Sequence, residues 1–204
     1  MRRLIEGLGE NSPKQYEEIY NKRKGEPDSQ DLRRWKKLLK HYKGGRLLDA
    51  GCLDSLASPL AKEKYPKSEV WGIDTARGAI LDMQERFPNV YYQVGDVYNT
   101  KFPDNYFAYI IAGELIEHLD DPQKFFKEAF RILKRGGILA VSTPLGETEE
   151  GEVDHLNHLW SFEEEDLIGL LEPYGKVWTR QMGSEFFPIY KYHFPTLLAF
   201  CSKK

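Results

Sequence analysis

Two carboxylates and an imidazole lie within five positions in the segment Glu114-Leu-Ile-Glu117-His118. Residues three and four apart share one face of a helical turn, so we expect these three side chains to converge. The set has two possible uses. It could bind Mg²⁺, Mn²⁺ or Zn²⁺ with His155 or His158 completing the ligand set, or His118 or Glu117 could act as a general base for a hydroxyl group. We expect His158, which stands beside an aromatic residue, to be structural.

A second group of carboxylates follows short apolar runs. Asp49 precedes Gly51 at the end of the first run, and Asp74 and Asp96 end or follow the next two. Ligands of doubly wound sheets bind outside the carboxyl ends of the strands, and a glycine there lets the backbone approach a ligand closely. The spacing of Asp74 suits the two hydroxyls of a ribose. Asp96 is placed to accept a hydrogen bond from an adenine amino group.

The elements that must position these residues alternate along the chain. Short apolar strands alternate with amphipathic helical patterns, which predicts a doubly wound parallel sheet with helices on both faces. The expected strands are Arg46–Ala50, Val70–Asp74, Val90–Val94, Phe107–Ala112 and Ile138–Thr143. The expected helices of this part are Leu56–Lys64, Ala76–Phe87 and Pro122–Lys134.

The last third of the chain carries its own signals. Asp121 and Pro122 are typical of an N-cap and a first helical residue. Ser161 and Glu164 have the spacing of a capping box, which predicts a helix from Ser161 that Gly175 ends. The tail favours two strands over 176–183 and 191–201 in a closing antiparallel pair, with irregular packing as the alternative.

The N-terminal part differs from the rest. Helical patterns cover Ser12–Lys24 and Asp28–Tyr42. Tyr16 and Tyr20 could fold over a bound ligand or simply pack between helices. We therefore expect one domain over 1–204, made of an N-terminal helical lid, 1–45, and a Rossmann-like core, 46–204.

Composition narrows the class of protein. The chain has 204 residues, a net charge of −3 and 41% hydrophobic residues, enough for one ordinary domain and too apolar for general disorder. No apolar run approaches the ~20 residues of a membrane-spanning helix, and the N-terminus lacks the apolar stretch of a secretory signal. Only two cysteines occur, Cys52 and Cys201, which predicts a reducing, cytoplasmic compartment without disulfides.

Charge is unevenly distributed. Residues 1–46 hold 13 Lys and Arg against 7 Asp and Glu, whereas the remainder holds 16 against 25. Residues 147–166 contain nine acids and no Lys or Arg. This acidic stretch disfavours a nucleic-acid partner, whose phosphates require positive charge.

Five motifs in order resemble the class I S-adenosylmethionine-dependent methyltransferases. They are Leu47-Leu-Asp-Ala-Gly-Cys52, Gly72-Ile-Asp74, Gly95-Asp-Val97, Glu114-Leu-Ile-Glu-His-Leu119 and Leu133-Lys-Arg-Gly-Gly137. The resemblance covers 46–175 and implies a seven-stranded sheet of order 3-2-1-4-5-7-6 with the last strand antiparallel. It implies S-adenosylmethionine as cofactor. The residues it places at the cofactor are Asp49, Ala50, Gly51, Cys52, Asp74, Thr75, Asp96, Val97 and Gly113.

The segment 114–122 resembles the ubiquinone-biosynthesis O-methyltransferases. This implies a small-molecule acceptor, most readily an oxygen, with His118 and Glu117 as catalytic residues. A possible divalent metal would use Glu114, Glu117, His118 and His155. The small-RNA 3′-terminal ribose 2′-O-methyltransferases share the Glu-x-x-Glu-His pattern and are the first alternative.

A second alternative is a non-catalytic partner that keeps the fold. It arises because Leu53 and Ser55 occupy positions where the family usually has glycine. Ser55 could cap the following helix instead. The sequence predicts no oligomeric state.

Overall fold

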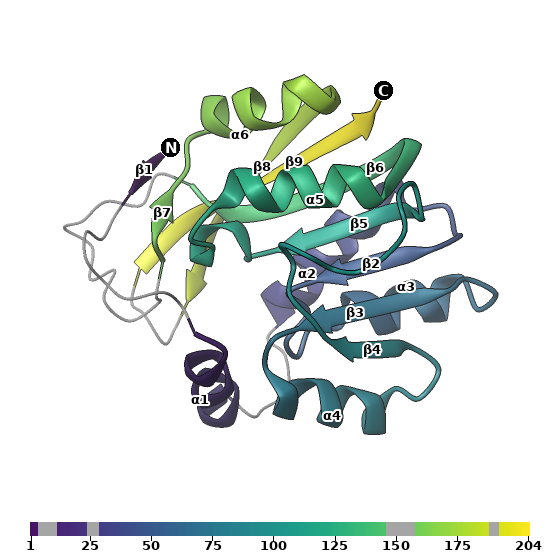
Figure 1. The fold of residues 1–204 in the computed structure, drawn as a ribbon. Coiled ribbons are helices and arrows are strands. Elements are labelled where there is room, and N and C mark those ends of the chain that lie inside the picture. Colours follow the sequence, from purple (N-terminus) through teal and green to yellow (C-terminus); the bar gives the residue numbers. More distant parts are fainter. Residues whose placement is uncertain (4–11, 24–28, 146–157, 188–191) are drawn as a thin grey trace.

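The computed structural model describes residues 1–3, 12–23, 29–145, 158–187 and 192–204. Its centre is a seven-stranded sheet of order β4-β3-β2-β5-β6-β9-β8 (Figure 1). Numbered along the chain within this sheet, the order is the expected 3-2-1-4-5-7-6. The strands are β2 (Leu47–Ala50), β3 (Val70–Asp74), β4 (Tyr91–Val94), β5 (Phe107–Gly113), β6 (Leu133–Pro144), β8 (Gly175–Phe187) and β9 (Tyr192–Lys203).

Only the last strand runs against its neighbours. β2 pairs in parallel with β3 and β5, and β5 pairs in parallel with β6. β9 pairs antiparallel with both β6 and β8. The closing antiparallel pair predicted for the tail is therefore confirmed, and so is the fold class.

Helices cover both faces of the sheet. The helices α2 (Ser29–Leu38), α3 (Ala57–Lys64) and α4 (Arg77–Arg86) pack against one face, and α5 (Pro122–Ile132) and α6 (Glu164–Leu171) against the other. Each face of the sheet has its own hydrophobic core, and neighbouring strand residues point into opposite cores. Leu47 packs with α2, α3 and α4, and Leu48 packs with α5 and α6; both side chains are essentially unexposed. Strands buried on both sides are the reason the apolar runs are continuous.

Three predicted boundaries were wrong, one of them the start of β6, which is Leu133 rather than Ile138. α5 ends at Ile132 rather than Lys134 because Leu133 already begins β6. Ser161 starts no helix, since it lies in the short strand β7 (Trp160–Ser161), paired with β1 (Arg2–Arg3). The capping box of α6 instead joins Glu163 to Asp166. The N-cap predicted at Asp121 is confirmed, because its Oδ1 accepts from the Lys124 amide.

The N-terminal helices lie against the core. α1 (Pro13–Arg23) contacts α4, and α2 continues into the 3₁₀ turn η1 (Leu39–His41). In Figure 1, α1 lies at the end of the sheet toward which the arrows of β2 to β5 point. None of the described helices is long and apolar enough to cross a membrane.

Candidate functional site at the carboxyl ends of the strands

The loop after β2 turns sharply at two residues with positive φ. Gly51 has φ +68°, and its amide donates to the Ile73 carbonyl at 2.9 Å. A Cβ on Gly51 would lie 2.6 Å from Leu115 Cδ1, so the loop passes under that side chain without room for another atom. Leu53 has φ +37°, in the left-handed region that favours glycine. The loop thus keeps a glycine-like conformation although Leu53 replaces the family's usual glycine.

Hydrogen bonds support that conformation. The Leu53 amide donates to Asp74 Oδ2 at 2.9 Å, and the Leu53 side chain packs with Tyr16 beside Tyr20, Ala76 and Ala79. Ser55 Oγ accepts from the amide of Ala57, the first residue of α3, at 3.0 Å. Leu56 rather than Ser55 is the N-cap residue of α3, so Ser55 satisfies the first helical amide from one position earlier than a standard N-cap.

Asp49 is a buried carboxyl near the end of β2. It is 2% exposed, and its Oδ2 accepts from Ser58 Oγ at 3.2 Å. Burial raises the pKa of Asp49 to about 7, against the lowering effect of hydrogen bonds from Ser55 and Ser58. Its neighbours Ala50 and Cys52 are buried, and burial raises the pKa of the Cys52 thiol.

The carboxylates of the next two strands differ in exposure. Asp74, at the end of β3, is 8% exposed, and its Oδ1 accepts from the Ala76 amide at 2.8 Å. Burial raises the pKa of Asp74. Asp96 after β4 is exposed and accepts from the Tyr98 amide, while Val97 is buried. Thr75 is half-buried in the loop that joins β3 to α4.

The helical turn expected to align Glu114 with Glu117 and His118 does not form. Glu114 has φ +49°, and only Ile116–His118 make a 3₁₀ turn, η2. Glu114 Oε1 accepts from Ser142 Oγ at 2.8 Å and lies 3.9 Å from Nε of the buried Arg34. The backbone at Gly113, half-buried at the end of β5, leads directly into this turn.

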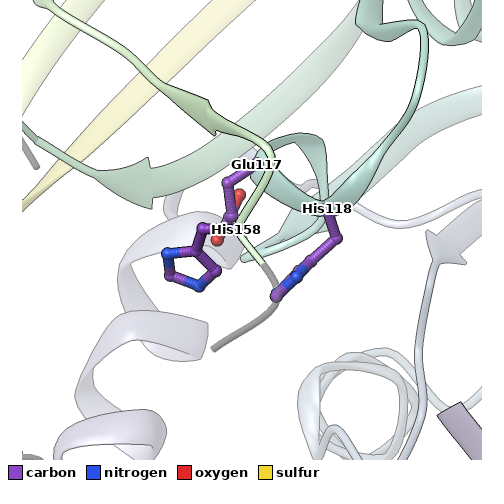
Figure 2. Close-up of side chains that lie close together, drawn as sticks. All are labelled: Glu117, His118 and His158. Atoms are coloured by element: carbon purple, nitrogen blue, oxygen red, sulfur yellow. The ribbon is translucent and has the colours of Figure 1, made fainter. Parts of the chain in front are cut away.

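Glu117 and His118 lie beside His158, one of the two imidazoles that could complete the ligand set. Their ligand atoms lie with those of His158 within 4.8 Å of one another (Figure 2). Glu117 is unexposed, and His158 is 5% exposed. Burial lowers the pKa of His158 to about 4, and the charge of Glu114 opposes this shift. His155 lies outside the described residues, so the structure does not place it.

α1 lies over the same edge. The Tyr16 ring packs edge-on against His118 with centroids 6.1 Å apart. Burial, then the charges of Asp74 and Glu117, raise the pKa of the Tyr16 hydroxyl far above its usual range. The two oxygens of Glu17 accept from the Gly78 amide, at 3.1 and 2.9 Å. Tyr16 therefore lies between the Asp74 loop and the η2 turn.

Three contributors were missed by sequence reasoning. Ser142 and Thr143 end β6 and hold Glu114 and Glu117, while Arg34 of α2 faces Glu114. Two hydroxyl residues at the carboxyl end of a predicted strand were a usable signal. Arg34 gave none, because it stands in a run of basic residues that reads as an exposed helix face.

Comparison with known proteins identifies the central part of the chain. Residues 48–141 match the family model described as a methyltransferase domain. A protein named as a probable S-adenosylmethionine-dependent methyltransferase, from Mycolicibacterium smegmatis, is 32% identical over 107 residues, 52% of this chain and 41% of that protein. A ubiquinone/menaquinone biosynthesis C-methyltransferase from Desulfotalea psychrophila is 29% identical over 110 residues, 51% of this chain and 45% of that protein.

Solved structures extend the likeness in fold to nearly the whole chain. Phosphoethanolamine N-methyltransferase 2 of Haemonchus contortus, in complex with S-adenosyl-L-methionine, has a TM-score of 0.69 at 17% identity. It covers 95% of this chain and 58% of that one. The cyclase SpnF has a TM-score of 0.64 at 17% identity, covering 84% and 81%.

These findings confirm the predicted resemblance to the class I methyltransferases. Residues 48–141 match a methyltransferase domain model, and the sheet has the fold of the solved methyltransferases. The chain spans less than half the length of the two curated relatives named above. Those relatives and the solved structures also differ in what they act on, since their names include a C-methyltransferase and an N-methyltransferase.

Proposed function

We propose that this chain transfers the methyl group of S-adenosylmethionine to an oxygen of a small-molecule acceptor. The observation that carries the proposal is the meeting of two groups of residues at one edge of the sheet. The carboxylates of the β2, β3 and β4 ends lie there beside the Glu117–His118 turn, within a matched methyltransferase domain.

The strand-end residues fit the cofactor chemically. Asp74 uses one lone pair of each oxygen on a backbone amide, which leaves further acceptor sites for the two hydroxyls of a ribose. Asp49 is a buried carboxyl, and a positively charged amino or sulfonium group beside it would favour its ionised form. Asp96 and Val97 are positioned at the end of β4 to receive an adenine.

Two glycines let the backbone of the proposed cradle pack closely. Gly51 brings the β2 loop against Leu115, and Gly113 brings the end of β5 against Leu38. We propose that Ala50, Cys52 and Thr75 contribute backbone to the cofactor cradle, because their side chains are buried or half-buried beside these loops. Leu53 does not fill the cradle on this view, since it packs toward α1.

The N-terminal residues 1–45 act as a lid in this proposal. Tyr16 packs against His118 on one side and the Ala76–Ala79 cluster on the other, and Glu17 fastens α1 to the first turn of α4. The Glu17 carboxylate lies at the N-terminus of α4, where the helix dipole stabilises a negative charge. A lid that excludes water would favour methyl transfer, because desolvation strengthens the electrostatic interactions inside a site.

His118 and Glu117 are the side chains we assign to the acceptor. A sulfonium is already activated, so positioning the acceptor supplies much of the rate. A neutral hydroxyl acceptor must give up its proton to a base as the methyl group is transferred, whereas a neutral amine can attack through its lone pair and lose a proton afterwards. The imidazole and carboxylate of the η2 turn provide for that requirement.

Titration of the full chain with S-adenosylmethionine and S-adenosylhomocysteine tests the cofactor. We expect one site, weakened by at least about 1 kcal/mol in Asp74→Ala, the size of a charge-assisted hydrogen bond. Glu85→Ala is the matched control, because Glu85 is an exposed carboxylate of α4. Absence of binding in the wild type would overturn the proposal.

The acceptor atom needs a separate measurement. S-adenosylmethionine carrying ¹³C in its methyl group, incubated with the protein and a panel of hydroxylated small molecules, would give a methoxy signal in the product. An N-methyl or C-methyl product would refute the oxygen assignment while leaving methyl transfer intact. A cytoplasmic location remains a prediction from cysteine usage.

A further inference from the structure

Three side chains of metal-ligating type converge beside the η2 turn. Glu117 and His118 are adjacent in that turn, and His158 comes from the segment that leads into β7. Their ligand atoms all lie within 4.8 Å of one another, and Figure 2 shows the two imidazoles and the carboxylate close together. The imidazole rings of His118 and His158 are 4.7 Å apart between centroids.

This juxtaposition is fixed by contacts outside the cluster. Thr143 Oγ1 donates to Glu117 Oε2 at 3.0 Å, so the end of β6 orients the carboxylate. The Leu159 amide donates to the Glu117 carbonyl at 2.7 Å and ties the residue after His158 to the η2 backbone. Such supporting contacts orient metal ligands and raise their affinity.

We propose that Glu117, His118 and His158 form a divalent-metal site, with Zn²⁺ as the preferred ion. One carboxylate oxygen and two imidazole nitrogens are a set typical of catalytic zinc, which leaves a fourth position open. Bonds of about 2.0–2.2 Å would bring the ligand atoms to roughly 3.4 Å of one another in a tetrahedral site. Separations of up to 4.8 Å must therefore shorten by at most somewhat over 1 Å, a change within the range of side-chain rotation.

The charge of the cluster suits a cation. Glu117 is unexposed, and a buried carboxylate is stabilised by a nearby positive charge. Burial favours the neutral form of His158, the form of imidazole that binds metals. With two neutral imidazoles and one carboxylate, a divalent ion gives the site a net charge of +1.

This ligand set differs from the one expected from the sequence. Glu114 turns to Ser142 and Arg34 rather than to the cluster, because its positive φ directs the chain away from a helical turn. Of the two imidazoles that could complete the set, His158 lies at the cluster, whereas His155 falls outside the described residues. The set is thus decided by the chain segment that folds back over η2.

The role of the ion rests on the proposed function, but the site itself does not. An acceptor hydroxyl bound at the open position would ionise more readily beside a net positive centre. His118 and Glu117 would then act on the acceptor through the ion. Binding of the metal alone can be measured without cofactor or acceptor.

The test uses the full chain, freed of metal with a chelator and dialysed, with ZnCl₂, MnCl₂ and MgCl₂ as separate probes. Calorimetry is expected to show one equivalent of Zn²⁺ bound more tightly than Mn²⁺, and Mg²⁺ weakest. Co²⁺ in place of Zn²⁺ should give the strong visible absorption of a four-coordinate site. Each of His158→Ala and His118→Ala should weaken Zn²⁺ binding at least tenfold, in line with the loss of one ligand.

His41→Ala is the matched control, because His41 lies on η1 against Trp178 and Phe200, outside the cluster. Glu117→Gln keeps an acceptor for Thr143 and removes the charge, so it separates loss of a ligand from loss of folding. Circular dichroism and thermal unfolding of each variant without metal report on folding. Unchanged Zn²⁺ affinity in the folded His158 and Glu117 variants, or no stoichiometric binding by the wild type, would overturn the site.

Activity measurements distinguish this inference from the proposed function. Loss of methyl transfer on chelation, restored by Zn²⁺, supports both. Stoichiometric Zn²⁺ binding without any binding of S-adenosylmethionine supports the site and refutes the proposed function. Methyl transfer that chelation leaves unchanged, in protein shown to be free of metal, overturns the catalytic role of the site.

Discussion

Asp49 makes the stability of the protein depend on pH in a direction opposite to that of an ordinary carboxylate. The side chain is 2% exposed, and burial raises its pKa from 3.8 to about 7. Between these two values the folded state binds a proton that the unfolded state has released. The stability contributed by this proton is therefore fully present below pH 3.8 and is lost as the pH rises through about 7.

The size of the effect follows from the shift. About three pH units at 1.36 kcal/mol each correspond to ~4 kcal/mol over the whole window. A comparison between pH 5 and pH 8 spans about two of those units, or ~3 kcal/mol. Asp49→Asn removes the titration but keeps an oxygen that can accept from Ser58 Oγ, so the variant should gain stability relative to the wild type as the pH rises.

Urea unfolding followed by tryptophan fluorescence, at intervals from pH 5 to pH 8, measures this difference. Subtracting the variant from the wild type cancels the titration of every other group that the two proteins share. A difference that stays constant over the range would refute the assignment of a raised pKa to Asp49. Opening of the site to water in solution would be one cause of that result.

The same variant tests the proposed role of Asp49 at the cofactor. An ionised Asp49 attracts a positively charged ligand, so the wild type should bind S-adenosylmethionine more tightly at pH 8 than at pH 6, by up to about tenfold. In Asp49→Asn this contribution should vanish, and what remains reports the titration of the cofactor itself. Equal pH dependence in both proteins would contradict the role.

Three further predictions concern single residues. Gly51→Ala should lower the free energy of unfolding by roughly 1–2 kcal/mol because of its positive φ, displace Leu115 and weaken S-adenosylmethionine binding in calorimetry. Gly136→Ala is the control: its φ is +73° and nothing lies within 4 Å of the added Cβ, so it should lose stability from strain alone and bind the cofactor normally. Glu128→Gln should lower the free energy of unfolding at pH 7 by about 1–2 kcal/mol in urea, a value reduced because Arg131 is partly exposed. Hydrogen bonds from Arg131 and Thr100 lower the pKa of Glu128 to about 2, so this stabilisation is present above pH 4.5 and is lost as the pH falls toward 2. An equal difference between variant and wild type at pH 3 and pH 7 would argue against it. Glu17→Gln should weaken the hydrogen bonds to the Gly78 amide by about 1 kcal/mol and speed the dissociation of bound cofactor, measured by stopped flow, up to about fivefold. The exposed Glu18, changed to Gln, is the control, and identical rates in both variants would show that α1 is not a lid.

The sheet could be read from the sequence because its strands are local and apolar. Runs such as Val70–Asp74 and Phe107–Gly113 are buried on both faces, so composition alone marks them. Their order came from the resemblance rather than from periodicity. Boundaries at Leu133 and Ser161 failed because pairing with a distant strand extended or replaced the locally preferred helix.

The sequence by itself determined which residues end the strands. Asp49, Asp74, Asp96 and the Glu117–His118 pair follow apolar runs, and a parallel sheet must bring such positions to one edge. The tertiary structure decided which of them meet. Glu114 turns to Ser142, His158 joins Glu117 and His118, and Tyr16 covers the edge, because each contact depends on chain segments 28 to 102 positions apart whose packing no local pattern encodes.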